Sequence, residues 1–111
     1  MDKLSLVAQG RNELAAARRA TSGRSAKTVY GGHEKVLRQT VIALNAGRST
    51  DGHQNPGEAT LQVLVGRLRL TTESTSWDGT PGDLIVVPQD RCQVHAVEDS
   101  AYLLTVAKLD T

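Results

Sequence analysis

The sequence contains few aromatic residues and one cysteine. Among its 111 residues there is no phenylalanine, and the aromatic side chains are Tyr30, Trp77 and Tyr102. Any hydrophobic core must therefore be mainly aliphatic. A single cysteine, Cys92, excludes an internal disulfide and the zinc sites that need paired cysteines. No run approaches the ~20 apolar residues of a membrane helix, and residues 1–5 lack the apolar run of a signal peptide. We therefore expect a cytoplasmic protein without a membrane partner.

The charge is unevenly distributed along the chain. Residues 1–27 carry six basic and two acidic side chains, whereas the remainder carries seven basic and ten acidic ones. A nucleic-acid partner would use Arg18, Arg19 and Arg24 as phosphate contacts. No recognition helix, zinc framework or aromatic platform accompanies them. Cations near the end of a helix also suit the helix dipole, so we expect no nucleic-acid partner.

The N-terminal region predicts one helix, over residues 12–22. Asn12 is a suitable N-cap, the alanine run that follows has high helix propensity, and Ser22-Gly23 is a stop signal. Leu4, Leu6 and Val7 leave open an extension of the helix towards the N-terminus, with Gly10 as its weak point.

From about residue 27 the pattern changes to that of short strands. Residues 35–45 are rich in β-branched side chains and apolar on both faces, which predicts a strand inside a sandwich or barrel. Turn sequences rich in glycine, proline and aspartate then separate further short strands, with no helix between them. We predict strands at 59–65, 67–72, 75–77, 84–88, 93–97 and 102–108. The length suits a single domain, divided into a helical arm (1–26) and an antiparallel β-barrel (27–111).

Two motifs carry a family resemblance. The first has Gly47, His53, Asn55, Ala59 and Gly66 at the spacing of the first cupin motif, whose residue types are G, H, H, E and G. The second runs from Gly82-Asp83 to Pro88 and is similar to the G-D-x-x-x-x-P of cupins.

In cupins a histidine follows the proline of the second motif. Its place falls on Gln93 by strict spacing, or on Cys92 if the segment is compared with short cupins that read P-x-x-R-H. The resemblance covers about residues 28–108. It implies an all-β fold: a double-stranded antiparallel β-helix, or jelly-roll barrel, of the RmlC-like type, preceded by an N-terminal α-helix.

The resemblance also implies where a metal would lie. Cupins with intact motifs hold a divalent metal with three histidines and a glutamate, and the matching positions here are His53, Asn55, Ala59 and either Cys92 or Gln93. Only His53 is an ideal ligand, so we expect a degenerate, non-catalytic metal site and no tightly bound cofactor. His53 and Cys92 leave zinc, nickel, manganese or iron open as weakly held metals.

Two further residues are of ligand type, but strand geometry opposes them. If Ala59 faces inward, then Glu58 faces outward, because side chains alternate along a strand. By the same rule His95 and Cys92 lie on opposite faces.

These observations favour a small-molecule binding protein, in which an apolar cavity holds a ligand without transforming it. We expect Leu61, Val63 and Leu68 on one wall and His53 and Asn55 at the mouth. The predicted pocket as a whole comprises His53, Asn55, Ala59, Leu61, Val63, Leu68, Cys92 and Gln93. We assign no catalytic residue.

Two alternatives remain open. The first is a metal-dependent cupin enzyme, such as a dioxygenase, isomerase or decarboxylase, that uses His53 and Cys92 with other ligands. The second is a structural dimer with a vestigial pocket. In either case apolar side chains on both faces of residues 35–45 predict a homodimer whose interface includes that strand.

Overall fold

The chain begins with one helix, α1 (Leu6–Arg19). The structure, a computed structural model, describes residues 3–54 and 57–108; the predicted turn at Asn55 and Pro56 lies outside the described residues. The side chain of Ser5 caps the helix by accepting a hydrogen bond from the Ala8 amide at 3.2 Å. The predicted start at Asn12 was therefore too late, because the helix continues through Gly10.

Gly10 is a buried position on the face of the helix that packs against the sheet. A Cβ atom at this position would lie 3.5 Å from the Ala101 side chain and 3.6 Å from that of Leu64. These are ordinary van der Waals distances, so alanine would also fit here. The helix continues through Gly10 despite a cost of about 1 kcal/mol, because Leu14 and Ala17 bury its apolar face against the sheet.

Eight strands follow the helix. Their bounds are β1 (Arg24–Tyr30), β2 (Leu37–Leu44), β3 (Glu58–Val65), β4 (Leu68–Thr71), β5 (Ser76–Gly79), β6 (Leu84–Val86), β7 (Gln93–Ala96) and β8 (Ser100–Ala107). The predicted strands from residue 35 onwards are confirmed with shifted ends. Strand β1 was not predicted, because its residues are mostly exposed and show no apolar alternation.

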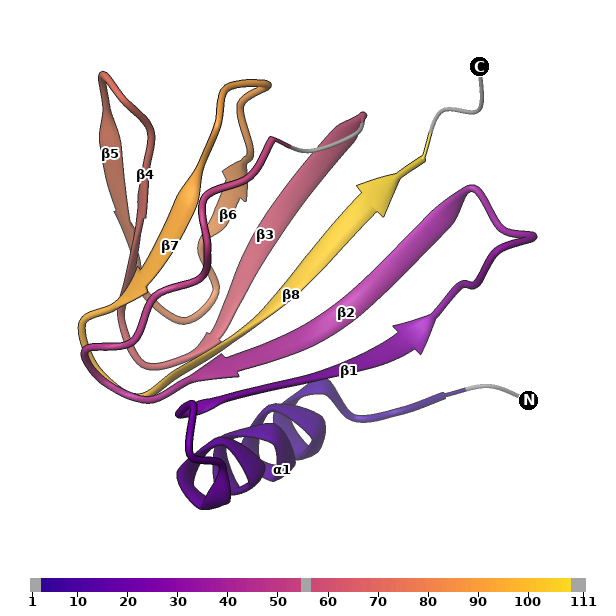
Figure 1. Cartoon of the computed structure of the whole chain (residues 1–111). Helices are drawn as coiled ribbons and strands as arrows, with labels where there is room; N and C mark the ends of the chain where they lie inside the picture. The colour runs from indigo at the N-terminus through magenta and orange to yellow at the C-terminus, as the bar shows by residue number, and fades with distance from the viewer. Residues whose placement is uncertain (1–2, 55–56, 109–111) are drawn as a thin grey trace.

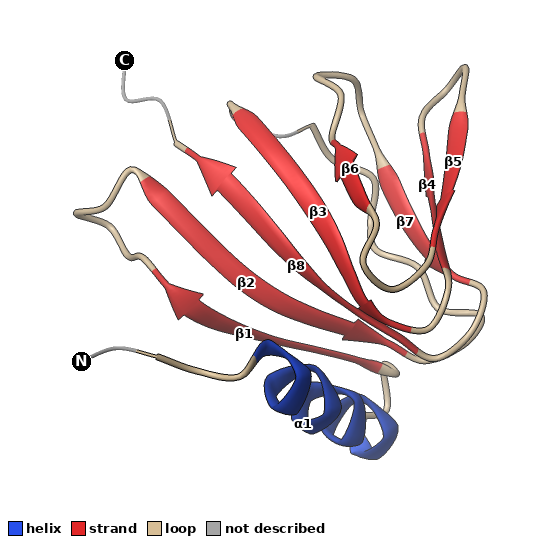
Figure 2. Cartoon of the chain, turned by 180° about the vertical axis from the view of Figure 1, so that it is seen from behind, coloured by secondary structure: helices blue, strands red, loops and turns tan. Residues whose placement is uncertain are grey.

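The strands form two antiparallel sheets. The larger has the order β1-β2-β8-β3-β6 and the smaller has the order β5-β4-β7. Figure 1 shows the sheets facing each other, close together at one end and spread apart at the other. Helix α1 lies on the outer face of the larger sheet (Figure 2), so the molecule is a jelly roll with an N-terminal helix. Across the described residues, no helix has the length and apolar character needed to cross a membrane.

Side-chain alternation assigns each residue of the larger sheet to the core or to the outer face. Ile42 and Leu44 of β2 point inward, towards the smaller sheet, and pack with Tyr102 of β8. Ala43 and Ala101 point outward, where they pack with Leu14 and Ala17 of the helix in a second, smaller cluster.

The two ends of the barrel are built differently. At the closed end, where β3 turns into β4 and β7 into β8, Gly66 has φ +80°, and a Cβ atom there would lie 2.1 Å from the Asp99 carbonyl oxygen. The buried Ser100 hydroxyl lies 2.9 Å from the Arg67 carbonyl oxygen and 2.7 Å from that of Glu98. At the open end, where β2, β3 and β7 begin and β8 ends, the sheets diverge.

Candidate functional site

A cavity of about 160 Å³ lies between the two sheets towards the open end. Its walls are mainly aliphatic and come from both sheets and from the segment before Cys92: Ile42, Leu61, Leu70, Val87, Leu104 and Val106. Binding sites for drug-sized ligands are usually ~300–1,000 Å³. A cavity of ~150 Å³ with aliphatic walls is large enough for benzene. This cavity therefore suits a ligand with a body of about six carbon atoms.

His53 stands at the rim of this cavity. Its backbone pairs with that of Cys92 through two hydrogen bonds of 3.0 and 2.9 Å, which join the loop after β2 to the start of β7. Its Nδ1 atom lies 3.2 Å from the Asp51 carbonyl oxygen, and its side chain is exposed. The imidazole is therefore held by a local contact near solvent, not buried in the cavity.

Cys92 lies in the cavity wall and is only 7% exposed. Its thiol donates to the Asp90 carbonyl at 3.0 Å and lies 3.7 Å from that of Pro88. Burial raises the pKa of the Cys92 thiol, and the nearby Asp90 charge raises it further. Because the thiolate is the nucleophile and the metal ligand, the neutral thiol is poorly suited to either role.

Ala59 faces the cavity, in one row with Val106 and Arg38 across the three neighbouring strands. Glu58 is exposed, as the alternation predicts. Gln93 is also exposed, and its amide donates to the Thr50 carbonyl at 2.8 Å. Of the two alternatives for the last cupin position, the structure thus places Cys92 inside the barrel and Gln93 outside it, so Gln93 does not line this cavity.

The depth of the cavity also differs from the prediction. Leu61 lines it, whereas Val63 and Leu68 lie in the packed core nearer the closed end. A Cβ atom added to Gly79 would lie 2.9 Å from Val63 and 3.6 Å from Leu68, which shows how tightly the sheets meet there. The predicted mouth residue Asn55 lies outside the described residues.

Nine of the thirteen described residues that line the cavity were not in the predicted pocket, among them Arg38 and Tyr102. Arg38 faces inward on β2, in the row of Val106, and Tyr102 faces inward on β8, in the row of Ile42. A signal for Arg38 existed, because Arg38, Ile42 and Leu44 are spaced by even numbers on one strand. The family motif begins at Gly47, after β2, and therefore did not include this strand.

The comparisons with known proteins concern the fold. No protein-family model and no curated protein sequence matches the chain. A solved structure of a conserved protein of unknown function from Streptococcus pyogenes is similar, with 26% identity and a TM-score of 0.70 over 83% of this chain and 80% of that one.

Two solved structures described as cupins are also similar. One is a cupin superfamily protein from Desulfitobacterium hafniense, with 14% identity and a TM-score of 0.70 over 78% of each chain. The other is an RmlC-like cupin from Desulfovibrio desulfuricans, with 22% identity and a TM-score of 0.67 over 76% of this chain and 81% of that one. The chain has the cupin fold.

The cupin fold raises the question of whether these residues fit a metal. No group of three His, Cys, Asp or Glu side chains converges within residues 3–54 and 57–108. Of the further candidates, His95 faces outward, where its Nδ1 atom lies 2.7 Å from the Ser49 hydroxyl. Tight divalent-metal sites take three or four protein ligands. The described side chains of this cupin barrel do not form such a set.

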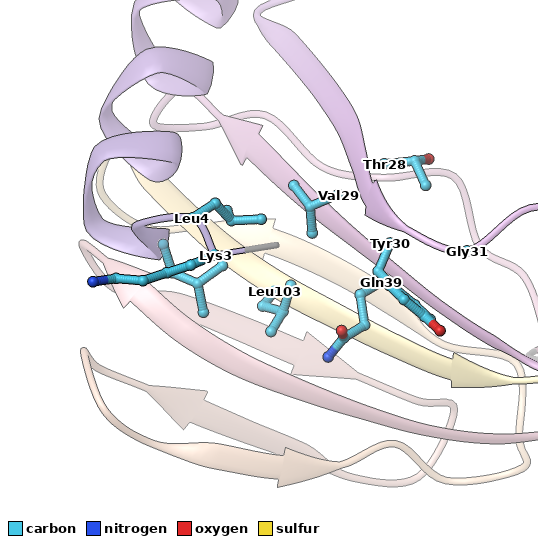
Figure 3. Close-up of a pocket in the computed structure, with 9 residues that line it drawn as sticks. Lys3, Leu4, Thr28, Val29, Tyr30, Gly31, Gln39 and Leu103 are labelled. Atoms are coloured by element: carbon cyan, nitrogen blue, oxygen red, sulfur yellow. The ribbon is translucent and has the colours of Figure 1, made fainter. Parts of the chain in front are cut away.

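A second hollow, of about 830 Å³, lies on the outer face of the larger sheet (Figure 3). The segment before α1 contributes Lys3 and Leu4, strand β1 contributes Tyr30, and the neighbouring strands contribute Gln39 and Leu103. It is an open groove with mixed polar and apolar walls, separate from the interior of the cupin barrel.

Proposed function

We propose that this cupin-fold protein binds a small molecule in its interior cavity and does not transform it. The observation that carries the proposal is the cavity itself: an aliphatic space of about 160 Å³ with its polar groups at the mouth and at the floor. Such a division between apolar walls and a few placed polar groups is typical of ligand sites. With one cysteine and no disulfide, we place this binding in the cytoplasm.

Binding is tested by thermal unfolding and by NMR titration with ring-sized probes of different charge. A bound probe raises Tm, because a ligand that binds only the folded state adds about 2.7 kcal/mol at 100 times its Kd. Filling the cavity by Ala59→Phe provides the matched control and should abolish the shift. If no probe binds the wild-type protein, the binding function is wrong.

A degenerate metal site is the second part of the proposal. It rests on the identity of the residues at the positions that match cupin ligands, where Ala59 has no donor atom and the Cys92 thiol is kept neutral by burial. Combining Asn55→His, Ala59→Glu and Cys92→His should create a site with His53. Divalent metal should then stabilise the triple variant by about 2.7 kcal/mol at 100 times Kd.

The wild-type protein is the matched control and should respond little to zinc, nickel or manganese. A rise of several degrees in wild-type Tm would mean that His53 and Cys92 bind metal, which supports the metal-dependent enzyme. If the triple variant folds without responding, a variant with Gln93→His in place of Cys92→His tests the other register.

Assembly into a homodimer is proposed separately. On the predicted interface strand, residues 35–45, the outward-facing Val41 and Ala43 are buried within the chain, and Leu37 stays exposed on the outer face. Leu84 and Val86 of β6 lie on the same face and are 62% and 74% exposed. Exposed apolar side chains gathered on one face favour association. Light scattering at micromolar concentration should report a dimer, and Leu84→Ser with Val86→Ser should give a monomer. A wild-type monomer under these conditions contradicts the dimer.

A further inference from the structure

The mouth of the cavity carries one permanent positive charge. Arg38 faces inward at the start of β2, in the row that includes Val106 and Ala59. Within the described residues, no hydrogen bond or ion pair engages its guanidinium group. No acidic side chain from that part of the chain lines the cavity. An anionic group on the ligand would therefore meet a free cation at the rim.

The geometry and charge of the Arg38 guanidinium group limit the class of anion that it binds well. A guanidinium group presents two parallel N–H donors that match the two oxygens of a carboxylate. Arg38 is exposed at the rim, so an anion bound there stays in contact with water. Its single positive charge neutralises a monoanion in full and a phosphate dianion only in part. Arg38 thus favours a monocarboxylate.

The floor of the cavity carries an unpaired hydroxyl group. Tyr102 is 2% exposed, lines the cavity, and lies in the row of Ile42, four residues further along β2 than Arg38. At ~3.3 Å per residue these rows are about 13 Å apart. No hydrogen-bond partner for the Tyr102 hydroxyl exists among the described residues.

That hydroxyl is a donor, not a charged group. Burial raises the pKa of Tyr102 above its ordinary value, so the phenol stays protonated across the physiological range. The hydroxyl oxygen borders the cavity and is not enclosed by packed protein, so water or a ligand atom can reach it. An oxygen atom at the deep end of a ligand would supply the missing acceptor.

We infer that the ligand is a monocarboxylate with a body of about six carbon atoms and an oxygen atom at the far end. Arg38 holds the carboxylate at the mouth, the aliphatic walls enclose the body, and the Tyr102 hydroxyl donates to the far oxygen. This inference rests on the proposed binding function and specifies the chemistry of its ligand.

The experiment uses 4-hydroxybenzoate as the probe and measures its Kd by calorimetry or NMR titration. We expect the wild-type protein to bind this acid at least 10-fold more tightly than 4-hydroxybenzamide, which lacks the charge. We expect a similar preference over benzoate, which lacks the far oxygen. A 10-fold ratio corresponds to about 1.4 kcal/mol.

Two variants separate the two contacts. Arg38→Gln should reduce the preference for acid over amide to nearly one, while Arg11→Gln, on the exposed face of α1, should leave it unchanged. Tyr102→Phe keeps the buried ring and should remove only the preference for 4-hydroxybenzoate over benzoate. Tyr30→Phe, at an exposed position, is its control.

Each failure has a distinct meaning. If 4-hydroxybenzamide binds as tightly as the acid, or if Arg38→Gln keeps the preference, the carboxylate assignment is wrong while the binding function stands. If 4-hydroxyphenyl phosphate binds more tightly than 4-hydroxybenzoate, the assignment of a monoanionic ligand is wrong. An unchanged preference in Tyr102→Phe would overturn the floor contact. If none of these probes binds, nor the cation 4-hydroxybenzylamine, then the binding function itself fails.

Discussion

The same strands form both ends of the barrel, yet one end is filled and the other is hollow. At the closed end, large aliphatic side chains such as Leu44 and Leu68 meet from opposite sheets and are fully buried. At the open end, the inward positions of the same strands carry Ala59 and Arg38, and a cavity remains. On β3 the inward side chain changes from Ala59 at the open end to Leu61 and Val63 further in, and on β2 it changes from the polar Arg38 to Leu44. The inward residues of each strand therefore become suited to packing only towards the closed end.

The two ends also differ in how polar groups are satisfied. At the closed end most polar groups are paired internally, as in the hydrogen bond of 2.8 Å from the Ala46 amide to the Asp99 carboxylate, although the buried Asn45 Oδ1 atom has no partner among the described residues. Around the cavity, the polar groups of Arg38 at the mouth and Tyr102 at the floor have no partner among the described residues. A binding site needs such unpaired groups, and the closed end supplies the stability that permits them.

The largest expected effect compares one leucine from each end. Leu44→Ala should lower the free energy of unfolding by about 4 kcal/mol, because it opens a new cavity in a packed region. Leu104→Ala, at the wall of the existing cavity, should cost only about 2 kcal/mol. Urea denaturation measures both. Equal costs would show that the two ends are packed alike.

A smaller effect is expected from the buried hydroxyl at the closed end. Ser100→Ala should cost about 1 kcal/mol, since it removes a hydrogen bond from a fully buried side chain. The exposed Ser76 on β5 provides a control, and Ser76→Ala should be neutral in the same denaturation experiment. If the two variants are equally stable, internal pairing contributes little to the closed end.

The charge on Asp99 should contribute less to the free energy of unfolding than the Ser100 hydroxyl group does. Its contribution depends on pH. The Ala46 amide, and then Arg18, lower the pKa of Asp99 below its ordinary value of 3.8. A lowered folded-state pKa stabilises the protein above the ordinary value, and the stabilisation is lost as the pH falls through the folded-state value. The carboxylate is partly exposed, so we expect less than ~1 kcal/mol.

Asp99→Asn should therefore be slightly less stable than the wild type at pH 7, with the difference disappearing in acid below pH 3.8. Chemical denaturation across this range measures it. Asp51→Asn, at an exposed position in the loop before His53, is the control and should show no such trend. A difference that grows in acid would contradict the sign of the effect.

The last prediction concerns reactivity and involves no change in stability. Cys92 at the open end should react slowly with a thiol reagent in the native protein and rapidly after unfolding, because burial raises its pKa and limits access. Fast native labelling that a ligand or metal suppresses would instead make Cys92 an accessible site residue. The labelling rate in the native protein therefore measures how accessible Cys92 is at the open end of the barrel.

The strands were predictable where apolar alternation and turn residues agree. The prediction for residues 59–65 matches β3 to within one residue, because every second side chain there is buried. Strand β1 has no such pattern and is a strand because β2 pairs with it, which is a tertiary effect. The continuation of α1 through Gly10 likewise depends on packing of the helix against the sheet, where Leu14 and Ala17 contact Ala43 and Ala101.

The sequence predicted that the cavity lies inside the barrel, but it did not predict how far the cavity extends between the sheets. Motif spacing placed His53 and Ala59 at the cavity, but by strict spacing it put the last position on Gln93, whereas comparison with short cupins put it on Cys92, which lines the cavity. It could not tell that Val63 lies beyond the cavity, since this depends on where the two sheets converge. Arg38 lies on a strand that precedes the motifs.

The position of β8 in the larger sheet has a consequence for protein synthesis. It is the last of the described strands, yet it lies between β2 and β3 and pairs with both. At roughly 5–20 residues per second, the ribosome completes β8 several seconds after β3. During that interval two aliphatic strands have no partner along one edge. Exposed edges of this kind favour pairing with other chains, so a nascent chain stalled before residue 100 should be prone to aggregate.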